Sequence, residues 1–226
     1  MRTTSLIDVD NTLLDNDAAK VELRRRVVAL LGERGNDRFW SAYEAVRAEL
    51  GVVDIPRTIA RTVAALTDRA VHRPLAELFM TFPFSDYIYP GALETLTFLR
   101  TLGPVVILSD GDPVFQPVKI ARSGLATAVD GYVLVFPHKE EHLLELAAAF
   151  PADRFLLIDD KPMVIERMTA RAAELGAPLE TILVRQGSYA ARIGADWAVA
   201  THAVDAIGDV PAVVEARGSR ETEKRS

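Results

Sequence analysis

The fold that this sequence predicts is most clearly indicated by SLIDVDNTLL, residues 5–14. Its apolar first half, with Leu6 and Ile7, is typical of a short buried strand. Two carboxylates, Asp8 and Asp10, follow directly, and side chains two residues apart on an extended chain point to the same side. Open α/β sheets bind their ligands at such strand ends. We therefore expect Asp8 and Asp10 to belong to a functional site.

The two acids also favour a particular chemistry. Carboxylates this close repel each other, which raises a carboxyl pKa unless a positive group lies between them. Mg²⁺ relieves such repulsion, because it binds one or two carboxylates together with waters and a substrate phosphate. The pair would suit a carboxylate nucleophile beside a second carboxyl group that acts as acid and base. Taken alone, the motif fits an ordinary polar turn after a strand equally well.

The composition is that of a globular protein with a substantial core. The chain has 226 residues, 49% of them hydrophobic, and it contains no cysteine. This length accommodates one large domain or a core with a smaller insertion. Without cysteine there are no disulfides and no thiolate metal sites, so we expect a cytoplasmic protein. Because no signal-like or membrane-spanning apolar run occurs, we also expect a soluble protein with no membrane partner.

The charge balance argues against a nucleic-acid partner. The formal net charge is −6, from 26 basic and 32 acidic residues, whereas nucleic-acid-binding domains usually present a basic surface. The basic run at residues 24–26 lies beside apolar residues at helical spacing, and we interpret it as the exposed face of a helix.

Residues 16–85 show helical periodicity with no convincing strand among them. The pattern predicts helices over residues 21–31, 39–50, 56–70 and 74–80, the first of them closed by Gly32 or Gly35. So long a helical insertion after a single strand predicts a separate cap subdomain over residues 16–85, with hinges near residues 15–17 and 84–86.

Strands and helices alternate in the rest of the chain, which predicts an α/β core of residues 1–15 and 86–214. Continuous apolar strands that alternate with helices indicate a parallel, Rossmann-like sheet covered by helices on both faces. The charged tail, residues 215–226, is expected to be disordered. Strands are expected at 105–108, 132–136, 155–158, 181–184 and 197–200, and helices at 90–102, from Asp112 onward, at 138–150 and at 164–175.

Polar residues follow further apolar strands, as they follow the first. Ser109 ends the strand VVIL, and Asp159 and Asp160 end the strand FLLI. Because the carboxyl ends of parallel strands share one edge of a sheet, these side chains should converge with Asp8. The occurrence of polar residues at the ends of several predicted strands is stronger evidence for a functional site than any single motif.

With these residues in place, the sequence resembles the haloacid dehalogenase-like (HAD) hydrolase superfamily over nearly its whole length. The first family motif, D-x-D-x-[TV], matches residues 8–12, and the second, a Ser or Thr that ends an apolar strand, matches Ser109. The third, a lysine ahead of the next strand, matches Lys139, and the fourth, an acidic pair that ends a strand, matches Asp159 and Asp160. The helical insertion looks like the cap of the subfamily with a helical lid.

The resemblance implies a Mg²⁺-dependent phosphohydrolase that acts on a small phosphorylated metabolite, a phosphate ester, through an aspartyl-phosphate intermediate. It implies Asp8 as the nucleophile, Asp10 as the acid and base, and Ser109 and Lys139 as catalytic residues that hold phosphoryl oxygens. The implied substrate-binding residues are Thr12, Ser109, Asp110, Gly111 and Lys139, and the implied metal ligands are Asp8, Asp10 through its backbone carbonyl, Asp159 and Asp160.

Two assignments within this site stay open. Lys119, in the helix after Ser109, is the rival of Lys139 as the lysine that binds phosphate, whereas Lys161 is expected to pair with the acidic cluster. Either acid of the pair at 159–160 could contact the ion, because the later acid that many relatives carry is replaced here by Val and Ile at 164–165.

The reaction also has alternatives on the same fold: a haloacid dehalogenase, a phosphomutase, or a non-catalytic relative with a binding role. Asp10 favours phosphoryl transfer, because a halide leaves without a proton and dehalogenases of this family generally lack an acid at this place. Tyr43 and Arg47 lie four residues apart on one cap helix, where a buried aromatic beside a surface arginine explains them better than a substrate contact does.

Overall fold

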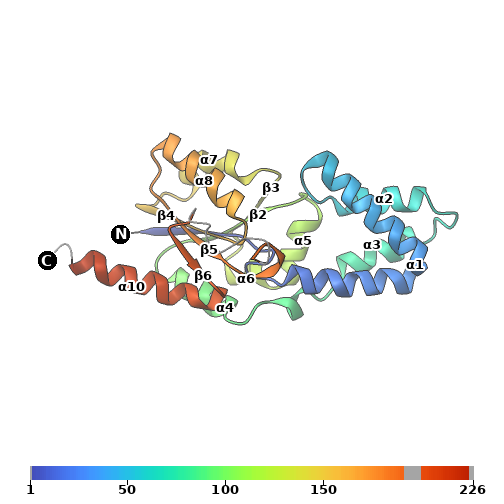
Figure 1. The fold of residues 1–226 in the computed structure, drawn as a ribbon, viewed down its shortest axis with the longest axis horizontal. Coiled ribbons are helices and arrows are strands. Elements are labelled where there is room, and N and C mark those ends of the chain that lie inside the picture. Colours follow the sequence, from blue (N-terminus) through green and yellow to red (C-terminus); the bar gives the residue numbers. More distant parts are fainter. Residues whose placement is uncertain (1, 191–199, 224–226) are drawn as a thin grey trace.

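A parallel sheet forms the centre of the protein, whose computed structural model describes residues 2–190 and 200–223 (Figure 1). The strands of the described residues are β1 (Thr3–Ile7), β2 (Val105–Asp110), β3 (Val133–Phe136), β4 (Arg154–Asp159), β5 (Leu179–Val184) and β6 (His202–Val204). They pair in the order β3-β2-β1-β4-β5-β6, and every neighbouring pair is parallel. The predicted Rossmann-like sheet is thus confirmed.

The register aligns the ends of the three central strands. Ile7, the last residue of β1, lies beside Ile107 of β2 and Ile158 of β4. The centres of these strands are apolar because both faces of the sheet are buried: Ile7 packs on one side, and Leu6 packs in a separate cluster on the other. The residues that follow the three strands therefore meet at one edge.

Helices cover both faces of the sheet, as Figure 1 shows. The side that contains Ile7 is covered by residues of α4 (Ala92–Arg100), α5 (Phe115–Arg122), α6 (Leu125–Ala128) and α10 (Val210–Glu223). The side that contains Leu6 is covered by α7 (Leu143–Ala149) and α8 (Pro162–Leu175). Single turns complete the described part: η1 (Phe84–Tyr87), η2 (Lys139–His142), α9 (Gly187–Ala190) and η3 (Ile207–Asp209).

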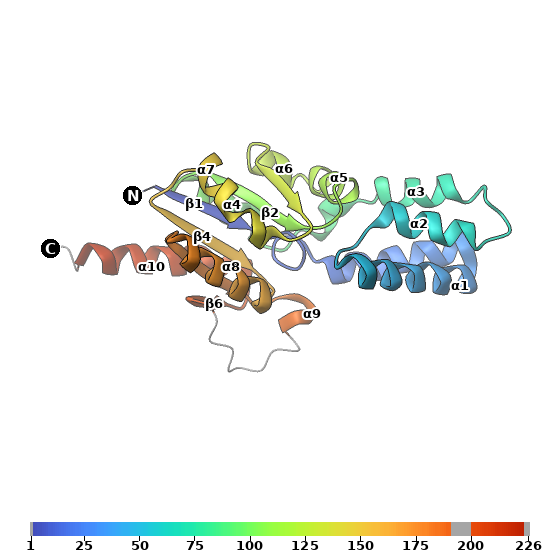
Figure 2. The ribbon, with the colours of Figure 1, turned by 90° about the horizontal axis from the view of Figure 1, so that it is seen from above.

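The helical cap region lies between β1 and β2 in the chain and extends away from the sheet beyond the carboxyl end of β1 (Figures 1 and 2). It contains α1 (Asn16–Leu50), α2 (Ile55–Ala64) and α3 (His72–Met80). Its two connections to the core run side by side, because Asp15 donates a backbone hydrogen bond to Tyr87 and Tyr89 donates one to Leu13.

The cap helices differ from the expected ones at two points. The first two expected helices are one kinked element, and the break lies at Gly32, whose φ of +69° suits glycine, rather than at Gly35. The third ends at Ala64 instead of residue 70. Beyond it the side chain of Asp68 accepts a hydrogen bond from the backbone of Ala70, which competes with helical pairing.

The C-terminal part also differs from expectation. The last strand lies at His202–Val204, whereas the strand expected at 197–200 falls largely outside the described residues. Residues 215–223, expected to belong to a disordered tail, continue α10, whose first turns are anchored by buried Val210 and Val214. Among the described residues, no helix combines the length and the apolar character that a membrane crossing requires.

Candidate active site

Three buried acids meet at the carboxyl edge of the sheet. Asp8 follows β1, Asp159 ends β4, and Asp160 comes next in the chain. A carboxylate oxygen from each lies within 4.8 Å of the others, and each residue is at most 1% exposed. The register of β1 against β4 produces this cluster, so the convergence expected from the strand ends is present in the structure.

Lys139 of η2 binds two of these acids. Its Nζ donates to Asp8 Oδ1 at 2.8 Å, to Asp159 Oδ2 at 2.6 Å and to the Leu108 carbonyl at 3.2 Å. Burial by itself would lower the pKa of Lys139, but the carboxylates of Asp159 and Asp8 raise it above its ordinary value. Burial likewise opposes the charge on Asp8, and the ammonium of Lys139 nevertheless lowers the pKa of Asp8.

The remaining oxygens of the acid cluster are suited to a cation. Within the described residues, Asp8 Oδ2 and both carboxylate oxygens of Asp160 are buried without a hydrogen-bond partner. Asp159 differs, because its two oxygens accept from Lys139 Nζ and from the backbone of Lys161. Burial raises the pKa of Asp160 well above its ordinary value. Hard oxygen ligands with unsatisfied lone pairs fit Mg²⁺, so the donor set of Asp8 and Asp160 suits the expected ion.

Asp10 lies outside the cluster formed by Asp8, Asp159 and Asp160. Its carboxylate forms an ion pair with Lys119 of α5, and its Oδ2 also lies 3.4 Å from Gln116 Nε2. Lys119 is 3% exposed and additionally donates to Asn16 Oδ1 at 2.8 Å. The two candidate lysines therefore contact different acids: Lys139 contacts Asp8, and Lys119 contacts Asp10.

The other expected substrate-binding residues surround the strand ends. Ser109 is buried, and its Oγ accepts from Gln116 Nε2 at 3.0 Å. Asp110 Oδ1 accepts from the backbone of Lys139 at 3.3 Å. At Gly111 a Cβ atom would lie 2.9 Å from Gln116, so a larger residue would displace that side chain. Thr12 is fully buried, and its Oγ1 has no hydrogen bond to a described residue.

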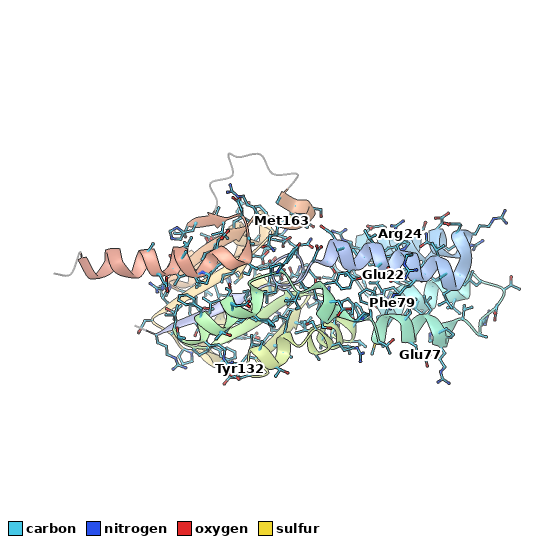
Figure 3. All side chains as sticks on the ribbon, turned by 90° about the horizontal axis from the view of Figure 1, so that it is seen from below. Glu22, Arg24, Glu77, Phe79, Tyr132 and Met163 are labelled. Atoms are coloured by element: carbon cyan, nitrogen blue, oxygen red, sulfur yellow. The ribbon has the colours of Figure 1, made fainter. Side chains whose placement is uncertain are left out.

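A cavity of about 590 Å³ lies between the core and the cap, and Asp110 and Gly111 are among the residues that line it. This volume is in the range of small-molecule sites. In Figure 3 the labelled Phe79, from the cap, and Met163, from the core, mark residues of its two sides. Charged and polar residues that line it include Asp10, Lys20, Tyr43, Glu44, Arg47, Asp110, Lys119 and Lys161.

Tyr43 and Arg47 of the cap both line this cavity, but they differ in exposure. Tyr43 is 4% exposed, and burial raises the pKa of its hydroxyl above the ordinary value. Arg47 lies 3.8 Å from Glu44, and its side chain is 46% exposed. Both line the cavity, so the expected buried aromatic and surface arginine also border the space that a substrate would occupy.

The sequence reasoning missed the segment at residues 186–189, which follows β5. Gln186 Nε2 lies 3.4 Å from the Thr12 carbonyl, and the backbone of Ser188 donates to Asp17 Oδ2 at 2.7 Å. Tyr189 lines the cavity. Polar residues directly after an apolar strand were the signal for the other site residues. The same signal after the strand expected at residues 181–184 would have predicted this segment.

The comparison with known families agrees with this geometry. The family model described as haloacid dehalogenase-like hydrolase matches residues 4–184. The chain belongs to the haloacid dehalogenase-like hydrolase family. A haloacid dehalogenase-like hydrolase from Burkholderia xenovorans is 37% identical, with a TM-score of 0.83, and the match covers 93% of this chain and 95% of that one.

More distant hydrolases of known structure share the fold. An L-2-haloacid dehalogenase from Xanthobacter autotrophicus is 18% identical with a TM-score of 0.63, over 95% of this chain and 99% of that one. A HAD hydrolase from Bacillus subtilis bound to magnesium is 16% identical with a TM-score of 0.62, over 94% and 98%. No curated protein matches the chain significantly in sequence.

Proposed function

We propose that this HAD hydrolase is a Mg²⁺-dependent phosphatase that acts on a small phosphate ester. The observation that carries the proposal is the position of Asp10, a second carboxylate that borders the cavity two residues after the buried candidate nucleophile Asp8. A phosphate ester requires both groups, because its leaving oxygen needs a proton after the bond to phosphorus breaks.

The proposed reaction has two steps. The Asp8 carboxylate attacks phosphorus, the bond from phosphorus to the ester oxygen breaks, and Asp10 gives a proton to that oxygen, so the alcohol leaves. Water then attacks the phosphorus of the aspartyl-phosphate while Asp10 takes up its proton, which releases phosphate and restores Asp8.

Other residues of the site would orient Asp8 and stabilise the negative charge of the phosphoryl group during both steps. Lys139 is bound to Asp8 and orients that carboxylate, while Ser109 lies at the adjacent strand end and offers its hydroxyl to a phosphoryl oxygen. Asp8 and Asp160, whose free oxygens fit Mg²⁺, would hold the ion, with the Asp10 carbonyl as a further ligand. A bound Mg²⁺ would neutralise negative charge on the phosphoryl group.

The cap region supports a small substrate. Its helices and the core border one cavity, whose volume fits a metabolite rather than a folded phosphoprotein. We propose that the cap, residues 16–85, acts as a lid that excludes water and contacts the leaving group. The paired connections at residues 13–15 and 87–89 are where such a motion would be absorbed.

Phosphate release from a panel of small esters tests this function, with and without Mg²⁺. We expect metal-dependent release that disappears in Asp8→Asn and falls about 10²–10⁴-fold in Asp10→Asn, the usual contribution of a general acid or base. Asp130→Asn is the matched control, because Asp130 is an exposed acid paired with Arg100 away from the cavity, and its activity should stay at the wild-type level.

Three results would contradict the proposal. Undiminished phosphatase activity in Asp10→Asn would remove the acid–base assignment. Halide release from a 2-haloacid, with no phosphate released from any ester, would show the dehalogenase instead. An isomerised ester in place of free phosphate would show the phosphomutase.

A further inference from the structure

Lys119 is a buried cation that the proposed reaction does not yet use. It lies on α5, 109 residues away in the chain from its partner Asp10, and its side chain is 4% exposed. Three segments meet at its ammonium group: Asp10 from the loop after β1, Asn16 from the first turn of α1, and Phe84 of η1, whose ring centre is 5.6 Å away.

The contacts of Lys119 differ from those of a phosphate-binding lysine. Lys139 already occupies the position next to Asp8, where the phosphoryl group would be attacked. The ammonium group of Lys119 instead contacts Asp10 Oδ1 and Asn16 Oδ1. Burying a lysine carries a desolvation cost, and here the Asp10 carboxylate offsets part of it. The main charged partner of Lys119 is therefore Asp10.

We infer that Lys119 is a positioning residue that holds the carboxyl group of Asp10 against the leaving oxygen, and that the substrates are alkyl phosphate monoesters. The inference rests on the proposed phosphatase function. Lys119 Nζ contacts Oδ1 of Asp10. Gln116 lies one turn earlier on the same helix, and its Nε2 is 3.4 Å from Oδ2 of Asp10. With Oδ1 held by the ammonium group, Oδ2 is the oxygen left for proton transfer. It gives the leaving oxygen the proton that Asp10 took from water in the preceding turnover, and the electron pair of the broken bond stays on the leaving oxygen.

The substrate class follows from the need for this proton. An alkoxide is a poor leaving group without protonation, whereas a nitrophenolate leaves readily as an anion. A fixed acid beside the leaving oxygen therefore accelerates alkyl esters far more than activated aryl esters. The contact with Asn16 extends the positioning to the start of the cap, since the same ammonium group holds Asp10 and the first residue of α1.

The experiment compares leaving-group release in a single turnover, with the Mg²⁺-loaded enzyme in excess over substrate. The alkyl probes are glycerol 3-phosphate, 3-phosphoglycerate and glucose 6-phosphate, and the aryl probe is p-nitrophenyl phosphate. We expect Lys119→Met to slow release of the alcohols by about 10–100-fold, part of the general-acid contribution, and release of nitrophenol by less than about 3-fold.

Two further variants separate positioning from a purely structural role. Lys119→Met added to Asp10→Asn should change alcohol release by less than about 2-fold, because coupled residues do not add. Arg122→Met is the matched control: it removes an exposed cation from the same helix, and both release rates should stay at the wild-type level. Asp10 is partly exposed, so water can replace the lost ammonium group, and circular dichroism should show Lys119→Met folded.

Other outcomes would contradict the positioning role, the substrate class or the proposed phosphatase function. An equal loss for alkyl and aryl esters, or additive losses in the double variant, would overturn the positioning role. Nitrophenol release with no alcohol from any alkyl ester would overturn the substrate class. Absence of release from all four esters would instead count against the phosphatase function itself.

Discussion

Replacing Asp160 with asparagine tests whether the buried acid cluster is a metal site. Mg²⁺ at 100 times its Kd would stabilise the folded state by about 2.7 kcal/mol. Because 1 kcal/mol shifts the Tm of a chain of this size by about 2–4 °C, we expect wild-type protein to melt about 5–10 °C higher with saturating Mg²⁺. Asp160→Asn should lose most of that shift, since both free oxygens of this residue belong to the proposed donor set.

The same substitution should act in the opposite direction without metal. The Asp160 carboxylate is buried without hydrogen bonds to described residues, and a neutral amide costs less to bury than a charge. We expect the metal-free variant to unfold with a free energy larger than that of the wild type by something on the order of 1 kcal/mol. A residue that is destabilising when the metal is absent and required when it is present is the signature of a ligand.

The assay is thermal unfolding followed by circular dichroism, in EDTA and across a Mg²⁺ titration. Asp130→Asn serves as the control: its exposed pair with Arg100 contributes at most about 1 kcal/mol, so the Mg²⁺ shift should persist. A full Mg²⁺ shift in Asp160→Asn would refute the assignment of this residue. The absence of any shift in wild-type protein would refute the metal site.

Two further predictions concern packing. Phe79 is 1% exposed, and its ring lies 5.1 Å from that of Phe39, so Phe79→Ala should cost about 3–5 kcal/mol in urea unfolding. Met80→Ala, at 39% exposure, should cost less than about 0.5 kcal/mol, and equal costs would contradict this packing. At Gly187 a Cβ atom would lie 2.5 Å from Asn11, next to Asp10, so Gly187→Ala should lower kcat for phosphate release. Gly124 also has a positive φ, but a Cβ atom there would meet nothing within 4 Å. Gly124→Ala should therefore lose about 1–2 kcal/mol of stability and keep its kcat. Equal kcat values in the two variants would exclude an effect of the contact between residue 187 and Asn11.

The core was predictable because its signals are local. Apolar runs predicted β1, β2 and β4 to within one or two residues of their ends. The rule that parallel strand ends share one edge of the sheet predicted that Asp8 and the acids at 159–160 lie close together. The cap was harder, because helix ends depend on competing side-chain contacts such as that of Asp68. Helix α10 was missed for a related reason, since it starts from the packing of Val210 and Val214, which composition alone does not predict.

The fold class, the helical insertion and the acids at the strand ends could be predicted from the sequence, because strand and helix periodicities depend on neighbouring residues. Which lysine contacts which acid depends on the folded structure. That structure also showed that Asp160, rather than Asp159, keeps both carboxylate oxygens free, and that residues 186–189 border the site. These pairings join side chains far apart in the chain, 109 residues for Lys119 and Asp10 and 131 for Lys139 and Asp8, and their geometry exists only after the sheet and the cap have packed.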